Sequence, residues 1–175
     1  MKSRVNVKIM TIGHSTRKVS ELLSLLKDRG ITMLVDIRTI PRSRYNPQFN
    51  KERLKRYLEK HGVSYVHVPE LGGLRRPKKD SNNVGWRNAS FRGFADYMQT
   101  LEFRKGLNFL LKGCSSNVVA LMCAEALPWK CHRSLIADAL VVRGVKVYHI
   151  IGKNSVKEHA ITSFAKVSGK DITYP

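Results

Sequence analysis

Residues 117–151 read NVVALMCAEALPWKCHRSLIADALVVRGVKVYHII, and the pattern of this segment is a clear indication of the fold. Short apolar runs over residues 117–122 and 145–151 predict two strands. Between them, residues 128–143 carry an apolar stripe at helical spacing, with Pro128 suited to the first turn and Gly144 suited to end the helix. Strands joined by a helix pair in parallel, so the segment predicts one unit of a parallel sheet.

The same alternation of apolar strands and amphipathic helices runs through the rest of the chain. It predicts an α/β fold: a single three-layer domain over residues 1–175, with a mostly parallel sheet of about five strands and helices on both faces. After Gly152 we expect one short amphipathic helix with Val156, Ala160 and Phe164 turned inward. The other expected strands cover residues 4–12, 31–37 and 63–68, and the other expected helices cover residues 19–29, 50–61 and 90–111, with a break near Leu101.

The charge of the chain is its most unusual bulk property. Among 175 residues, 32 lysines and arginines face 13 aspartates and glutamates, which gives a formal net charge of +19. A charge of this size favours a polyanionic partner: nucleic acid, a phosphorylated substrate or an anionic membrane surface. The alternative is a solvated basic surface that reflects the host rather than the site.

Other bulk features concern the location of the protein. No run of about 18 apolar residues is present, so no membrane span is expected. Three cysteines, an odd number, do not form a closed set of disulfides, and the first residues form no apolar signal core. Together these features predict a cytoplasmic protein.

Ligands of open parallel sheets bind at the carboxyl ends of the strands, and ionisable residues follow the predicted strand ends here. After the first strand, Gly13 allows a tight turn, and the next helix offers free backbone N–H groups to an anion. Ser15 and Thr16 suit either a phosphate contact or a plain N-cap. His14 suits either general acid–base catalysis or a structural hydrogen bond to the backbone.

The second strand ends at Asp36, which we expect to be partly buried and therefore paired, with Arg38 as the nearest partner. Asp36 then either braces the loop as an ion pair or acts as an acid–base or metal-binding carboxylate. Arg44 follows in a loop stiffened by prolines, where an arginine can clamp a phosphate group.

The long loop after the third strand begins with a pair of glycines, Gly72 and Gly73. Glycine lets the backbone approach a ligand closely. Arg75 lies beside them and opens a basic run that can track a phosphate backbone. The alternative is a solvated loop without a ligand.

The segment from Met122 to Arg133 is the richest in reactive groups, and three interpretations compete for it. Cysteine, histidine and glutamate ligands can hold zinc, although their spacing matches no standard arrangement. Cys131 can be a nucleophile, although no Cys-x5-Arg phosphate loop is present. In the third interpretation, which we prefer, Glu125 is the acid–base group, His132 and Arg133 hold an anion, and the cysteines only pack.

These motifs form a combination that extends over nearly the whole chain. It comprises Thr11–Arg17, Asp36–Arg38 with Pro41, Ser43 and Phe49, Leu71–Gly73 with Arg75, Phe91–Ala95, Leu121–Glu125, Cys131–Arg133 and Gly144–His149. The combination resembles DUF488, a family of domains of unknown function. The resemblance implies a compact α/β domain, a prokaryotic cytoplasmic protein and a site shared by these motif residues, but no activity.

The first hypothesis from the sequence is an enzyme, a hydrolase or a transferase, acting on a phosphate-bearing substrate such as nucleic acid or a nucleotide. The alternatives are a non-catalytic nucleic-acid-binding module and a thiol- or zinc-dependent site at Cys123 and Cys131. The sequence predicts no particular cofactor, metal or oligomeric state. The expected catalytic residues are Glu125, Asp36 and His14, and the expected substrate-binding residues are Ser15, Thr16, Arg38, Arg44, Gly72, Gly73, Arg75, Cys131, His132 and Arg133.

Overall fold

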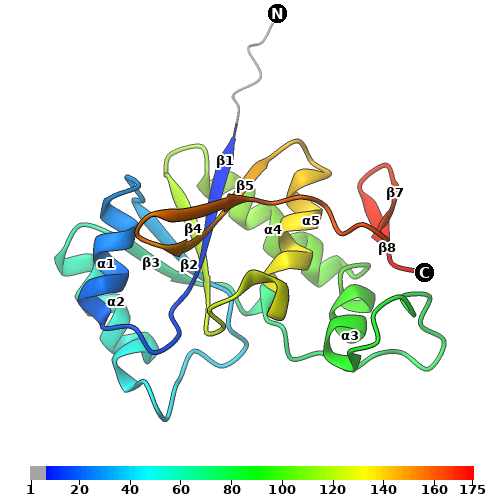
Figure 1. Cartoon of the computed structure of the whole chain (residues 1–175), viewed down its shortest axis with the longest axis horizontal. Helices are drawn as coiled ribbons and strands as arrows, with labels where there is room; N and C mark the ends of the chain where they lie inside the picture. The colour runs from blue at the N-terminus through cyan, green and yellow to red at the C-terminus, as the bar shows by residue number, and fades with distance from the viewer. Residues whose placement is uncertain (1–6) are drawn as a thin grey trace, which may run out of the picture.

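The computed structural model describes residues 7–175, so the first part of the strand expected over residues 4–12 lies outside the described residues. A six-stranded sheet in the order β3-β2-β4-β1-β5-β6 forms the centre of the protein (Figure 1). Five strands are parallel, and β6 pairs with β5 in the antiparallel direction. The strands are β1 (Lys8–Gly13), β2 (Met33–Asp36), β3 (Ser64–His67), β4 (Val119–Cys123), β5 (Lys146–Gly152) and β6 (Ser155–Glu158).

Helices cover both faces of the sheet, which confirms the α/β three-layer fold (Figure 1). Successive strand residues point to opposite faces, so Ile9 packs into the core beneath α3, α4 and α5, and Met10 into the core beneath α1 and α2. The helices are α1 (Val19–Lys27), α2 (Lys51–Lys60), α3 (Ala89–Tyr97), α4 (Leu101–Gly113) and α5 (Arg133–Val141), with short 3₁₀ turns η1 (Pro47–Phe49), η2 (Pro69–Leu71) and η3 (Pro128–Lys130).

The apolar character of the strands follows from this layering. All five residues of β4 and the last five of β1 are buried, because a parallel strand between two helical layers has no solvent face. This burial on both faces explains why the two strands contain continuous apolar runs. The sheet places their carboxyl ends, at Cys123 and Gly13, side by side.

Helix boundaries agree with the local signals in one place and differ in another. The break expected near Leu101 is confirmed, since α3 ends at Tyr97 and Thr100 caps α4 by accepting a hydrogen bond from the Phe103 backbone N–H. The helix expected to begin at Pro128 begins instead at Arg133. Residues 128–130 form η3, so Cys131 and His132 lie in the turn before the helix rather than inside it.

The prediction of a helix after Gly152 is wrong. Residues 155–158 form β6, and the chain then continues to a hairpin of β7 (Lys166–Ser168) and β8 (Asp171–Thr173). Val156 and Phe164, expected to face inward, are 43% and 39% exposed. The open edge of β5 offers unpaired backbone groups, and pairing with them satisfies β6 better than a helix with only three apolar positions.

Among residues 7–175, no helix is long and apolar enough to cross a membrane.

Candidate active site

A cavity of about 340 Å³ opens at the carboxyl ends of β1, β2 and β4, the edge of the sheet that the topology rule indicates. Its wall combines segments that are far apart in the sequence. The lining residues are His14, Arg38, Thr39, Ile40, Arg42, Ser43, Gly73, Leu74, Ser90, Phe91, Cys123, Ala124, Glu125, Lys130, Cys131 and His132.

Cys123 ends β4 and is only 2% exposed, and its sulfur atom is surrounded by donors. Arg133 Nη1 donates to Cys123 Sγ at 2.6 Å, and the Cys131 thiol donates to the same sulfur at 3.0 Å. Burial alone raises the pKa of Cys123, but the hydrogen bond from Cys131 and the positive charge of Arg133 lower it to about 7. The same contact with Cys123, together with burial, raises the pKa of Cys131 well above its usual value. Cys123 therefore becomes the thiolate and Cys131 remains the thiol.

Arg133 is completely buried, and its other contacts fix it below the loop that follows β4. Nη1 also donates to the carbonyl oxygen of Glu125, and Nη2 donates to the carbonyl oxygen of Ala126 at 2.8 Å. Gly13 allows this loop to pass close to β1, because a Cβ atom there would lie 1.8 Å from the Glu125 carbonyl oxygen. The guanidinium therefore acts on Cys123 and does not line the cavity.

His132 presents one ring nitrogen toward the cavity. Its Nε2 lies 3.0 Å from the Leu71 carbonyl oxygen and 3.2 Å from that of Ile37, so Nε2 carries the proton. The Nδ1 lone pair then lies 3.5 Å from Cys131 Sγ. Burial lowers the pKa of His132 to about 4, so the ring is neutral at pH 7. Gly73 makes room for this ring, since a Cβ atom there would lie 2.4 Å from Nδ1.

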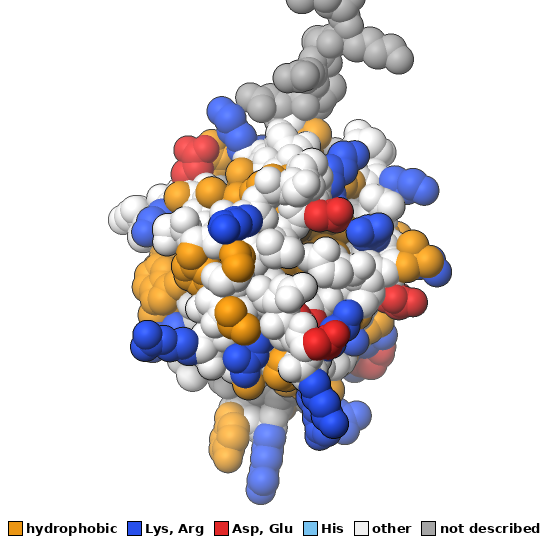
Figure 2. Space-filling view, turned by 90° about the vertical axis from the view of Figure 1, so that its right-hand side faces the viewer, with side chains coloured by type: hydrophobic (Ala, Val, Ile, Leu, Met, Phe, Trp, Pro, Cys, Tyr) orange, Lys and Arg blue, Asp and Glu red, His pale blue; other side chains and the backbone are white. Residues whose placement is uncertain are grey.

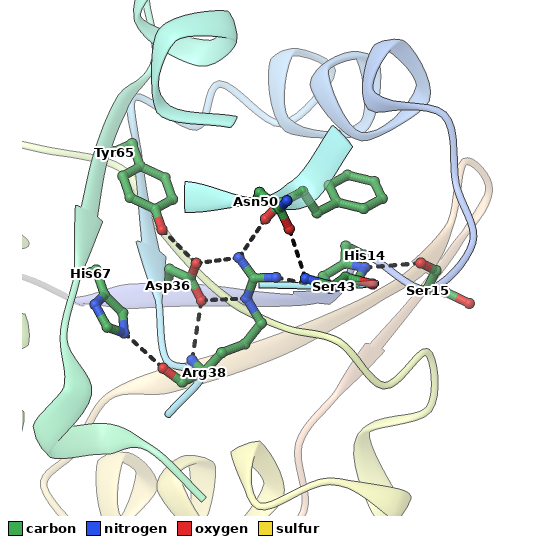
Figure 3. A network of polar contacts seen from close by, with 9 residues as sticks. His14, Ser15, Asp36, Arg38, Ser43, Asn50, Tyr65 and His67 are labelled. Atoms are coloured by element: carbon green, nitrogen blue, oxygen red, sulfur yellow. Dashed lines mark hydrogen bonds and ion pairs between the residues drawn. The ribbon is translucent and has the colours of Figure 1, made fainter. Parts of the chain in front are cut away.

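His14 also lines the cavity, and one of its ring nitrogens likewise faces a backbone carbonyl oxygen, that of Ser15 (Figure 3). Nδ1 donates to the Ser15 carbonyl oxygen at 2.9 Å, and Nε2 accepts from Arg38 Nη1 at 3.3 Å. The ring stacks on Phe49, with centroids 4.3 Å apart. Burial lowers the pKa of His14 to about 4, which makes it a neutral acceptor rather than a cation at pH 7.

Asp36 and Arg38 form a buried ion pair (Figure 3). Arg38 lines the cavity, and Asp36 does not. Asp36 Oδ2 accepts from Arg38 Nη2 at 2.6 Å and from the Tyr65 hydroxyl at 2.5 Å, and Oδ1 accepts from Arg38 Nε at 2.9 Å. Arg38 also donates to the Phe49 carbonyl oxygen at 2.7 Å. The geometry is that of the bracing ion pair, the structural one of the two interpretations of Asp36.

The remaining predicted residues lie around the cavity rather than in its wall. Neither Ser15 nor Thr16 caps α1, because the N-cap position is Lys18. Ser15 has a positive φ of 48°, which an L-residue rarely adopts outside a constrained turn. Arg75 stacks over Tyr97, 3.7 Å from the ring centroid, and donates to the Gly72 carbonyl oxygen at 3.1 Å.

Of the predicted residues, the structure brings together six in the cavity wall: His14, Arg38, Gly73, Glu125, Cys131 and His132. Asp36 and Arg133 support it from behind, and Ser15, Thr16, Arg44, Gly72 and Arg75 are not part of the wall. Glu125 is exposed, as is Arg44.

The preferred interpretation of the sequence assigned Cys123 to packing and kept a thiol-dependent site at Cys123 and Cys131 as an alternative. In the structure, the Cys123 sulfur lies within 3.5 Å of a thiol, a guanidinium and a backbone carbonyl oxygen. A usable signal was present: a cysteine at the end of an apolar strand, with an arginine at the start of the next helix. Lys130 lines the cavity without having been singled out as part of the site, and Phe91, one of the motif residues, lines it as well. Within residues 7–175, no group of three or more histidine, cysteine or acidic residues is arranged to hold a metal ion, so the zinc alternative has no ligand set there.

Comparison with known proteins supports the resemblance carried by the motifs. The family described as "Domain of unknown function DUF488" matches residues 18–140. No curated protein and no solved structure matches the chain.

Proposed function

We propose, from the premise that the chain belongs to the DUF488 family, that the cavity is an active site in which Cys123 attacks an anionic, phosphate-bearing substrate. The observation that carries the proposal is the Cys123 sulfur at the cavity wall, with Arg133 Nη1 2.6 Å away and the Cys131 thiol 3.0 Å away. A thiolate held by a cation and a thiol donor is an activated nucleophile.

The chemistry would proceed in two steps. Cys123 Sγ would form a bond to the electrophilic atom of the substrate while the bond to the leaving group breaks. Water would then cleave the sulfur-linked intermediate in a hydrolase, or a second substrate would accept the group in a transferase. His132, neutral at pH 7 with its lone pair at Nδ1, is the group placed to accept a proton from the attacking water, whereas the Nε2 lone pair of His14 is already engaged by Arg38.

The phosphate-bearing class of substrate follows from charge and from the rim of the cavity. The chain carries +19, and Arg42 and Lys130 line the opening, where their charges remain free to meet an anion. Arg38 and Arg133, which were expected to hold phosphates, are already engaged by internal partners. Phe91 lines the same wall and offers a ring on which a nucleobase can stack, which favours nucleic acid or a nucleotide.

A non-catalytic nucleic-acid-binding module is the second candidate, and the net charge favours it. On the face shown in Figure 2, however, lysines and arginines are spread among acidic and apolar side chains and form no single patch. The cavity, with Arg42 and Lys130 in its lining, is the stronger argument for a specific ligand.

The test combines a substrate panel with two single substitutions and one control. Labelled single- and double-stranded DNA and RNA, and free nucleotides, are titrated at rising salt concentration, and the products are separated on a gel. We expect steeply salt-dependent binding with product formation, and loss of product in Cys123→Ser with binding retained. Cys114→Ser is the matched control, because Cys114 lies at the end of α4, outside the cavity.

The Glu125→Gln variant tests whether the catalytic group is the Cys123 thiolate or the Glu125 carboxylate. If Cys123 is the nucleophile, the exposed Glu125 contributes little and the variant keeps most of its turnover. A loss of about 10²–10⁴-fold in Glu125→Gln, with an active Cys123→Ser, would transfer the catalytic role to the carboxylate. Binding without product under every condition would support the non-catalytic module.

A further inference from the structure

The sulfur atoms of Cys123 and Cys131 are 3.0 Å apart, and both residues line the cavity. A disulfide bond requires a separation of about 2.05 Å, so the two sulfur atoms need to approach by only about 1 Å. They differ in protonation, because Arg133 contacts Cys123 and Cys131 donates its proton toward Cys123. A thiolate beside a thiol is the arrangement in which one sulfur attacks and the other completes a disulfide.

We propose that Cys123 and Cys131 form a redox-active dithiol that reduces a small hydroperoxide, an activity separate from the reaction proposed above. The Cys123 thiolate attacks the outer peroxide oxygen, the O–O bond breaks, and the remaining oxygen leaves as an alcohol or water after taking up a proton. Cys123 is then a sulfenic acid. Cys131 Sγ attacks the Cys123 sulfur, the S–OH bond breaks, and water leaves. The dithiol has lost two electrons to the peroxide.

The surroundings of the pair fit each step. Arg133 Nη1, 2.6 Å from Cys123 Sγ, stabilises the thiolate before attack. His132 Nδ1, 3.5 Å from Cys131 Sγ, carries a lone pair because Nε2 donates to backbone carbonyls. His132 is thus placed to accept the Cys131 proton as that sulfur attacks the sulfenic acid. Cys131 is 6% exposed and Cys123 is 2% exposed, so a small, neutral oxidant reaches them through the cavity more readily than a protein disulfide does.

Cys114 is the internal control for this proposal. It follows α4 as its C-cap residue, and its thiol donates to the Leu110 carbonyl oxygen at 3.3 Å. Burial raises the pKa of Cys114, so its thiol is less reactive than that of Cys123. The Cys114→Ser protein therefore retains only the pair in question and serves as the parent for all measurements.

The first experiment treats this parent with one equivalent of hydrogen peroxide and counts free thiols under denaturing conditions. We expect the loss of both thiols, a mass decrease of two hydrogen atoms in the monomer, and recovery of both thiols with a dithiol reductant. Retention of both thiols, or an intermolecular disulfide in place of the internal one, would overturn the proposal.

The second experiment assigns the roles of the two cysteines in the same parent. With Cys123→Ser, peroxide consumption should be lost. With Cys131→Ser, Cys123 should still react but stop at the sulfenic acid, which a dimedone-type probe traps. Without the probe, a second equivalent of peroxide should oxidise the sulfenic acid to the irreversible sulfinic acid. The opposite pattern would assign the attack to Cys131 and contradict a mechanism in which Cys123 reacts first. Because peroxide is the only reactant, these outcomes do not depend on whether a phosphate-bearing substrate is turned over.

Discussion

The chemistry of the cavity depends on which nitrogen and sulfur atoms carry protons. In His14 and His132, one ring N–H donates a hydrogen bond to a backbone carbonyl oxygen, so the other ring nitrogen is an acceptor. Cys131 donates toward the Cys123 sulfur, and the positive charge of Arg133 beside Cys123 lowers the pKa of that thiol. The reactive state of each residue is therefore set by its neighbour and not by its own type.

The reactivity of Cys123 should follow its lowered pKa. In Cys114→Ser protein, alkylation of Cys123 by iodoacetamide should rise as the pH rises through about 7 and then level off, because only the thiolate reacts. Cys131→Ala removes the thiol that donates to Cys123 and should move the midpoint to higher pH. A midpoint near that of an ordinary thiol, about 8.5, in the parent protein would contradict the assigned environment.

At the scale of elements, short turns rather than helices build the site. η3 reverses the chain between β4 and α5 and returns Cys131 to within 3.0 Å of Cys123, eight residues earlier. The turn after η2 brings Gly73 against the His132 ring, which a side chain at that position would displace. η2 and η3 each begin with a proline, which fixes φ and suits the first position of a helical turn.

Gly73→Ala tests this close packing. The added Cβ would lie 2.4 Å from His132 Nδ1 and 2.6 Å from its Cγ, so the buried ring must move. We expect a loss of about 1–3 kcal/mol in the free energy of unfolding, measured in urea, together with slower reaction of Cys131. Gly152→Ala is the matched control, since nothing lies within 4 Å of the atom it adds. Equal stability of the two variants would show that the His132 ring is not confined as described.

At the scale of the whole molecule, one buried carboxylate holds the tail against the helical layer. Asp138, fully buried on α5, accepts from His159 Nε2 at 2.7 Å, Thr162 Oγ1 at 2.7 Å and the Tyr174 hydroxyl at 2.8 Å. His159 continues the network to His149 of β5, with ring nitrogens 2.9 Å apart. The position of the chain from β5 to Tyr174 thus depends on a hydrogen-bond network in which each nitrogen of His159 has one partner.

The burial of three histidines predicts that the free energy of unfolding decreases in acid. Burial lowers the pKa of His14 and His132 to about 4 and of His149 to about 3, so the unfolded chain takes up protons first as the pH falls below about 6.5. The free energy of unfolding should therefore be largest above pH 6.5 and decrease steadily toward pH 4, as measured by urea denaturation at each pH. His61→Gln, which changes an exposed histidine, should leave the slope unaltered. A flat profile between about pH 6.5 and 4.5 would show that these histidines are not buried in neutral form.

The alternation of strands and helices, and the edge of the sheet at which the cavity lies, could be predicted from the sequence. Both depend on local apolar spacing and on the rule that parallel strands end together. The sequence also predicted the pairing of Asp36 with Arg38, since the two are only two residues apart. The tertiary structure was needed to show that the tail adds a strand, that Arg38 also donates to the Phe49 carbonyl oxygen, and that the buried Arg133 guanidinium contacts the Cys123 sulfur. These outcomes depend on backbone edges, charges and donors supplied by segments distant in the chain, and local patterns carry no record of such contacts.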